Sequence, residues 1–127
     1  MTSLYPILPV AALVLFVLTT VGEGLRPSRG WLFAGLICAL FAAFSLYTVA
    51  SEGPFGFWPN HTQNAWGNQV WFDLLIAIAI GWTLLLPRAR AVGMNPWPWL
   101  ALICTTGCIG LAAMFARCRY LETRQTN

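Results

Sequence analysis

The chain has 127 residues, of which 58% are hydrophobic and only 9% are charged. Soluble domains carry about 25% charged residues, so a soluble protein of this length could not cover its surface with so few. The basic residues are seven arginines, the net charge is +3, and the arginines lie between apolar runs. This pattern indicates the flanks of membrane spans and excludes a nucleic-acid-binding protein.

Four long apolar runs predict four membrane-spanning helices, at about residues 4–22, 31–50, 70–86 and 97–116. About twenty helical residues cross a hydrocarbon layer roughly 30 Å thick. Runs of this length without period-two alternation exclude strands. We therefore expect an all-α membrane protein, a single domain over residues 1–127 that folds as an antiparallel four-transmembrane-helix bundle.

The first run is predicted to be a span of the mature protein and not a secretory signal. No basic segment precedes it, and no convincing small-residue cleavage site follows it before Arg26.

The second run contains a stripe of small residues, because Gly35, Ala39 and Ala43 recur every four positions. Small residues let a neighbouring helix approach closely, and close packing is a principal source of helix association in lipid. We therefore predict that this stripe faces another helix.

The connection at residues 51–69 mixes aromatic residues with Gly, Pro and Asn and contains no Lys or Arg. This composition predicts a loop in the lipid headgroup region. His61, the only histidine, lies there without the neighbours that a metal site or a nucleophile–base pair requires. It is interpreted as an interfacial loop residue, and a catalytic or pH-sensing role is the alternative.

The third run organises the chain because it holds Asp73, the one carboxylate inside an apolar segment. An ionisable group entering a membrane is energetically costly and calls for a partner or a function. Pro87 is expected to close this span, and Arg88 and Arg90 follow it as soon as the apolar run ends.

The fourth run, if antiparallel to the third, brings its own end level with the beginning of the third. We therefore predict an ion pair between Asp73 and either Arg117 or Arg119, which would orient this hairpin. The alternative is that Asp73 couples protons or cations to transport.

A second stripe of small residues in the fourth run consists of Cys104, Cys108 and Ala112. Helix packing is the favoured interpretation, because metal sites need three or four ligands and the other two cysteines lie at different predicted depths. A soft-metal or redox role for the thiol pair is the alternative. No metal site and no cofactor motif is predicted.

Tryptophans gather at the ends of the predicted spans, at Trp58, Trp66, Trp71, Trp97 and Trp99. Their usual role there is an aromatic belt at the membrane surface. A platform for the ring system of an isoprenoid, sterol or quinone is the alternative.

The distribution of arginines predicts the orientation. With both termini outside, the inside connections carry four arginines and the C-terminal segment carries three. The flanks of the first helix usually dominate, so we expect both termini outside.

The second half of the chain carries a set of segments that together resemble a known family. They are Asn64-Ala65, the helix start Trp71-Phe-Asp-Leu-Leu-Ile76, the turn Arg88-Ala-Arg-Ala-Val-Gly-Met94, and a last span that ends in Arg117-Cys-Arg-Tyr-Leu-Glu122. In these it resembles the DUF2834 family of small bacterial integral membrane proteins of unknown function, but Ala112–Ala113 stand where the family commonly has a proline. The resemblance implies a four-span module of the bacterial cytoplasmic membrane, with Asp73 and the later arginines as signature positions.

Three functional hypotheses follow. The first is a non-enzymatic accessory module that packs with membrane lipid, with other membrane subunits or with further copies of itself; it is favoured because no catalytic constellation is visible. The second is a small proton-coupled transporter that uses Asp73. The third is a membrane enzyme or redox protein acting on a lipid or quinone through His61 or the pair Cys104 and Cys108.

Overall fold

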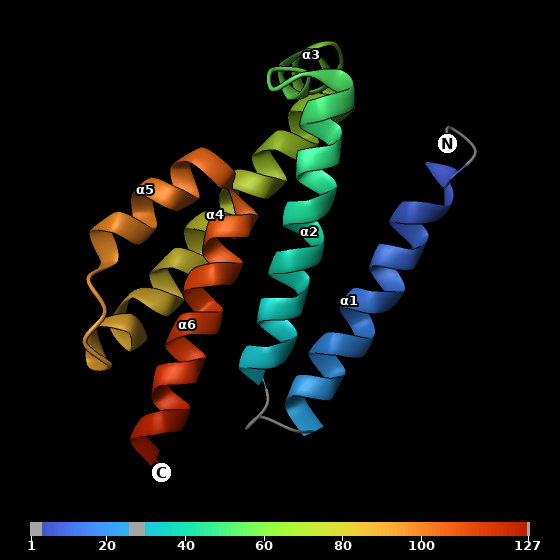
Figure 1. Cartoon of the computed structure of the whole chain (residues 1–127). Helices are drawn as coiled ribbons and strands as arrows, with labels where there is room; N and C mark the ends of the chain where they lie inside the picture. Colours follow the sequence, from blue (N-terminus) through green and yellow to red (C-terminus); the bar gives the residue numbers. More distant parts are fainter. Residues whose placement is uncertain (1–3, 26–29, 127) are drawn as a thin grey trace.

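The computed structural model describes residues 4–25 and 30–126, and within these ranges it contains helices and no strand (Figure 1). The helices are α1 (Ile7–Leu25), α2 (Gly30–Glu52), α3 (Phe57–Thr62), α4 (Ala65–Ala91), α5 (Pro96–Thr106) and α6 (Cys108–Thr126). The all-α class predicted from the sequence is therefore confirmed.

α1 and α2 cover the first two predicted apolar runs, and α1 makes only slight contact with α2. Figure 1 shows α1 at the edge of the molecule, away from the other helices. Arg26 and Arg29, which were expected to mark the inside connection, lie outside the described residues.

α3 and the beginning of α4 occupy the segment that was expected to be a loop. α4 begins at Ala65, five residues before the predicted span. The reason is a local cap: the side chain of Asn64 accepts a hydrogen bond of 2.8 Å from the backbone N–H of Gly67. The connection that was expected to be a loop therefore contains a short helix and the capped start of the next helix.

α4 continues past Pro87 to Ala91, so the expected closure of the span at Pro87 does not occur. A proline inside a helix removes one backbone hydrogen bond and crowds the preceding turn. Packing beyond the proline outweighs this cost, because Ala89 is fully buried and Arg88 pairs with a second helix.

The fourth predicted run is broken at Gly107, which has φ +67° and ψ −126°, a conformation that favours glycine. α5 ends there, and α6 folds back against it. A Cβ atom on Gly110 would lie 2.8–2.9 Å from backbone atoms of Leu102 and Ile103, so the two helices approach very closely. The expected continuous helix over residues 97–116 is therefore not formed.

The reversal at Gly107 sets the direction of the last helix. Leu111 contacts Gly81, and Phe115 lies beside Arg88, so α4 and α6 run in the same direction. α5 runs opposite to both (Figure 1). This extra reversal places the beginning of α1 and the end of α6 at opposite ends of the molecule (Figure 1), whereas four antiparallel spans would place them at the same end.

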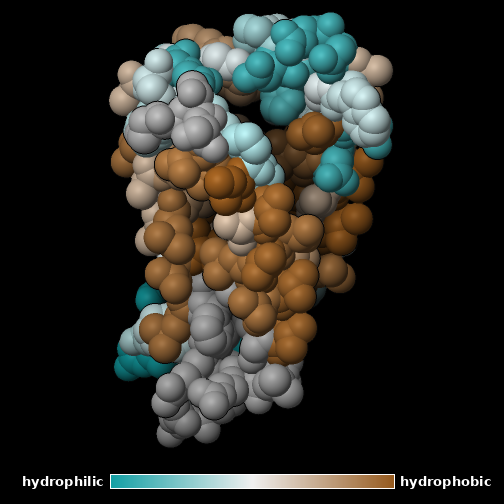
Figure 2. Space-filling model, turned by 90° about the vertical axis from the view of Figure 1, so that its right-hand side faces the viewer, coloured by the Kyte–Doolittle hydropathy of each residue, from teal (hydrophilic) through white to brown (hydrophobic). Residues whose placement is uncertain are grey.

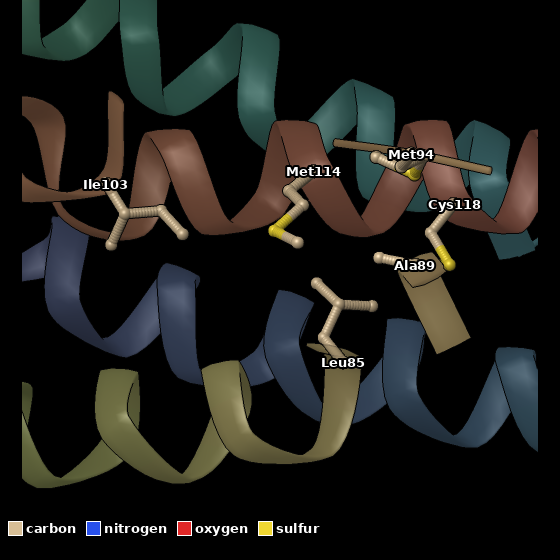
Figure 3. Packing of buried hydrophobic residues seen from close by; sticks show 6 residues of the cluster. All are labelled: Leu85, Ala89, Met94, Ile103, Met114 and Cys118. Carbon is tan, nitrogen blue, oxygen red and sulfur yellow. The ribbon is translucent and has the colours of Figure 1, made fainter. Parts of the chain in front are cut away.

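The core is small and lies where α4, α5, α6 and the turn between α4 and α5 meet. Its buried members are Leu85, Ala89, Met94, Ile103, Met114 and Cys118. Figure 3 shows Met114 and Cys118 of α6 directed toward Leu85 and Ala89 of α4. This cluster fixes the C-terminal half of α4 to α6.

α2 packs against α6 more extensively than any other two described helices pack together. The rings of Trp31 and Tyr120 meet edge to face with centroids 5.2 Å apart. Farther along, the thiol of Cys38 donates to the carbonyl of Ile109 across 3.4 Å. These pairs show that α2 and α6 are antiparallel.

The packed face of α2 differs from the predicted stripe. Ala39 and Ala43 are exposed, and nothing lies within 4 Å of where a Cβ on Gly35 would be. Ala34 is buried and Cys38 is half-buried on the packed side. Residues spaced by four drift about 40° per step around a helix of 3.6 residues per turn, so such a stripe turns away from a straight interface.

Large apolar side chains cover the outside of α1, α2 and α4. Figure 2 shows one face of the molecule, on which apolar side chains form a brown belt with hydrophilic side chains above it and at its lower edge. Two helical stretches, Ala34–Glu52 and Ala65–Ala91, are long and apolar enough to cross a membrane. Only 6% of the most apolar window of each is buried, whereas the core helix of a soluble protein is mostly buried.

Candidate functional site

A bidentate ion pair joins the C-terminal end of α4 to α6. The Nε atom of Arg88 donates to Oε1 of Glu122 at 2.8 Å, and Nη2 donates to Oε2 at 2.7 Å. Two parallel charge-assisted bonds fix both the distance and the angle between the groups. The pair therefore sets how α6 lies along the end of α4.

Arginines surround this pair and rest on two aromatic rings. The guanidinium carbons lie 5.7 Å (Arg88) and 5.8 Å (Arg119) from the centroid of Phe115, and 5.6 Å (Arg117) and 5.8 Å (Arg124) from that of Tyr120. Distances below about 6 Å are those of cation–π contacts. We call these four arginines, with Phe115, Tyr120 and Glu122, the arginine cluster.

The charges of the described side chains are separated along the molecule. Arg90, in the last turn of α4, adds a fifth cation to the four of the arginine cluster, where Glu122 is the one carboxylate. Glu52 ends α2 at the α3 end, and Asp73 lies in the half of α4 nearer to α3. The arginine-cluster end therefore carries a strong positive potential.

The environment of Glu122 favours its ionised form. The hydrogen bonds from Arg88 hold the pKa of the Glu122 carboxyl below its usual range, while partial burial opposes that shift. The thiol of Cys118 lies 3.7 Å from Oε1 of the same carboxylate and supports it weakly. The pair is thus charged at neutral pH.

An apolar groove of about 440 Å³ runs between α4 and α6 toward the arginine cluster. It is lined by Gly81, Leu84, Leu85, Arg88, Cys108, Leu111, Ala112 and Phe115. Ala112 adds little bulk to this lining, the side chain of Leu111 covers Gly81, and Arg88 and Phe115 close the polar end of the groove. The groove combines an apolar channel with a cationic end.

Asp73 lies far from the arginine cluster. It precedes Arg88 by 15 residues, which places it about 22 Å farther along the helix axis. Asp73 is exposed, and the one ion pair among the described residues joins Arg88 to Glu122. The expected pair with Arg117 or Arg119 is not formed, because α6 runs with α4 and not against it.

A shallow hollow of about 380 Å³ adjoins Asp73. Its lining comes from α4 alone and includes Gln69 one turn before Asp73, together with Trp66 and Ile76. A polar pair on an otherwise apolar helix face is the main feature of this surface.

His61 has a packing role at the α3 end. Its Nδ1 atom lies 3.3 Å from the carbonyl oxygen of Gly67, and its ring centroid lies 5.0 Å from that of Trp71. Phe57 stacks on the same tryptophan at 6.1 Å. These contacts hold α3 against the beginning of α4.

The cysteines of the second predicted stripe lie on different helices. Cys104 is exposed on α5, whereas Cys108 and Ala112 are half-buried on α6 beyond the break at Gly107. They therefore do not share one helix face as predicted. Among the described residues, no three His, Cys, Asp or Glu side chains gather closely enough to hold a metal ion.

The tryptophans named from the sequence lie at both ends of the apolar belt. Trp58, Trp66 and Trp71 belong to α3 and the beginning of α4, and the first two are exposed. Trp97 and Trp99 lie in the first turn of α5, where Trp99 packs against the core. These are positions at which a membrane-surface belt would be expected.

The pair formed by Arg88 and Glu122 was not predicted, although the sequence contains a signal for it. The chain has four acidic residues, and Glu122 is the one that follows Asp73. Asp73 was expected to pair with an arginine of the last helix because that helix was expected to be unbroken.

Compared with models of protein families, with curated proteins and with solved structures, the chain matches none.

Proposed function

We propose that this chain is a small non-enzymatic integral membrane protein of the bacterial cytoplasmic membrane, an accessory module that associates with lipid or with other membrane subunits. The observation that carries the proposal is the exposed apolar belt of α1, α2 and α4, one face of which Figure 2 shows. Among the described side chains, Asp73 is the one charged group between the two ends of this belt. Such a belt has a low free energy in lipid and a high one in water.

The proposal gives the bundle three full crossings, by α1, α2 and α4, in place of the four expected from the apolar runs. α5 and α6 then form a re-entrant hairpin. Gly107 lies ten residues from Arg117, hence about 15 Å along α6, which is half of a hydrocarbon layer roughly 30 Å thick. A Cβ atom on Gly107 would lie 3.9 Å from the side chain of Ile78, in the middle of α4, and this neighbour supports the same depth.

The orientation follows from the positive-inside rule. The five described arginines at the C-terminal end would face the cytoplasm, and the α3 end would face outward. An odd number of crossings then puts the N-terminus outside and the C-terminus inside.

The assignment as non-enzymatic rests on the kind of contacts at the site. Guanidinium groups on aromatic rings and on a carboxylate fix helices and attract anions, but they supply no nucleophile. The resemblance of the second half to the DUF2834 family would place the chain among proteins of the same membrane and size.

Reporter fusions test both the membrane location and the number of crossings. We expect a C-terminal fusion, and one in the turn between Ala91 and Pro96, to report the cytoplasm. A fusion at Gly53 should report the outside, and alkaline carbonate should leave the protein in the membrane fraction. Release by carbonate would contradict the proposal. An outside C-terminus would favour four full crossings and contradict the re-entrant hairpin.

A further inference from the structure

We infer that the groove between α4 and α6 binds an anionic phospholipid, with an acyl chain along the groove and the phosphate at the arginine cluster. This inference rests on the proposed membrane location and names the lipid class that the module takes.

The apolar part of the site has the size of a ligand site. Its volume of about 440 Å³ lies within the range of roughly 300–1,000 Å³ that is usual for ligand pockets. Ala112 lines it with a methyl group alone, the side chain of Leu111 lies over Gly81, and Leu84 and Phe115 add further apolar lining. A flexible hydrocarbon chain is the shape that such an open apolar channel accepts.

The length and depth of the groove suit one membrane leaflet. From Gly81 to Arg88 on α4, and from Cys108 to Phe115 on α6, it covers seven residue steps, or about 10 Å. One leaflet of hydrocarbon is roughly 15 Å deep. The groove thus begins near mid-membrane and ends at the arginines, where the phosphate of a lipid in that leaflet would lie.

Charge selects an anionic headgroup. Five arginines and one carboxylate, Glu122, lie at this end among the described side chains. Guanidinium groups match phosphate oxygens with two-pronged hydrogen bonds. Arg88 and Arg119 both lie over Phe115, so the ring that closes the groove also holds two cations at its end.

The apolar groove is continuous with the arginine cluster, and this favours a lipid over a free anion as the ligand. Inorganic phosphate would leave the apolar channel without an occupant, and a neutral lipid would leave the charge uncompensated. The cytoplasmic leaflet, where the positive-inside rule places this end, is the one enriched in anionic lipid.

Binding is measured on the full chain in mild detergent by native mass spectrometry. The probes are a phosphatidylglycerol and a phosphatidylcholine with identical acyl chains. We expect retention of the phosphatidylglycerol in clear preference to the phosphatidylcholine. Arg119→Gln should weaken it roughly tenfold, the effect of one charge-assisted hydrogen bond. Arg90→Gln removes an equal charge at the same end but outside the groove, and should change retention less than twofold.

Two groove variants test the apolar half. Ala112→Phe fills the channel and should abolish the preference for phosphatidylglycerol. Because a phenyl ring at that position also presses on α4, Leu84→Trp provides a second test: Leu84 is 68% exposed, so a larger side chain there narrows the groove without entering the core.

Several outcomes would overturn the inference. Equal retention of the two lipids would show that binding does not depend on the charge of the headgroup. Equal losses of phosphatidylglycerol retention in Arg90→Gln and Arg119→Gln would show that the general surface potential causes the preference, and not a site at the groove. Displacement of the lipid by millimolar inorganic phosphate would show that the acyl chain contributes nothing. A carbonate-resistant protein without lipid preference refutes the lipid site alone, whereas a carbonate-extracted protein refutes the proposed function as well.

Discussion

Arg88 and Glu122 are joined by two hydrogen bonds of 2.8 and 2.7 Å, and this pair links the end of α4 to α6 across 34 residues of sequence. Their side chains are 41% and 32% exposed, so solvent partly screens the attraction. The geometry is nevertheless the favourable bidentate one, and it lies directly beside the buried Ala89 and Cys118.

A double-mutant cycle on Arg88→Gln and Glu122→Gln should reveal coupling between the two residues. We expect a coupling free energy of about 1 kcal/mol, at the upper end for exposed pairs because the contact is bidentate. The measurement is chemical unfolding of the four proteins in one detergent. Arg124→Gln combined with Glu122→Gln is the matched control and should be additive. Additive behaviour of the Arg88 cycle would contradict a stabilising role for the pair.

The same pair predicts how stability depends on pH. The pKa of Glu122 is lowered in the folded protein, chiefly by the hydrogen bonds from Arg88. The stability that the ionised carboxylate contributes is therefore fully present above the ordinary glutamate pKa of about 4.3. It is lost as the pH falls through the lowered pKa of the folded protein. Unfolding of the wild type should become easier below about pH 4, and Glu122→Gln should show a smaller change over that interval. Parallel curves for the two proteins would contradict this assignment.

Gly107 should be intolerant of a side chain. Its positive φ of 67° is unfavourable for other residues, so Gly107→Ala should destabilise the protein by roughly 1–3 kcal/mol. Gly35→Ala is the control, because Gly35 lies within α2 and nothing lies within 4 Å of the new Cβ. That change should be neutral or stabilising by about 0.5–1 kcal/mol. Unfolding in detergent compares the two, and equal effects would argue against the break at Gly107.

The close approach of α5 and α6 predicts a second difference between glycines. Gly110→Ala would place Cβ 2.8–2.9 Å from backbone atoms of α5, which cannot move alone, so we expect a loss of roughly 1–3 kcal/mol. In Gly81→Ala the new Cβ meets the end of the Leu111 side chain, which can rotate away. Its effect should be clearly smaller, and a larger effect at Gly81 would show that the hairpin is packed differently.

The helical class and the positions of the apolar segments could be predicted, because each depends on composition within one stretch of chain. Pro87 and Gly107 are two of the places where prediction failed, and the later mismatch between Asp73 and the last arginines follows from the second. Pro87 was expected to end a helix but lies inside α4, since Ala89 beyond it is buried. Gly107 breaks a helix, whereas Gly35 and Gly81 lie within helices. Two threonines precede Gly107, and their hydroxyls donate to carbonyls of α5, but Thr83 makes the same kind of bond inside the unbroken α4. This local difference therefore does not predict the break, and the break decides which arginines meet which carboxylate.

The substitution of Asp73 tests the role of the exposed carboxylate on α4. It lies about 22 Å from Arg88 along the helix, which is inside a hydrocarbon layer if Arg88 lies at the membrane surface. It has no ion pair among the described residues. An ionised group there is unfavourable, so Asp73→Asn should leave the protein as stable or stabilise it by about 1 kcal/mol in lipid nanodiscs. Glu52→Gln, at the end of α2, is the control and should have no effect. A destabilised Asp73→Asn protein would mean that the carboxylate is satisfied by a partner. Loss of proton uptake in proteoliposomes with stability retained would instead make Asp73 a coupling residue and support the transporter hypothesis.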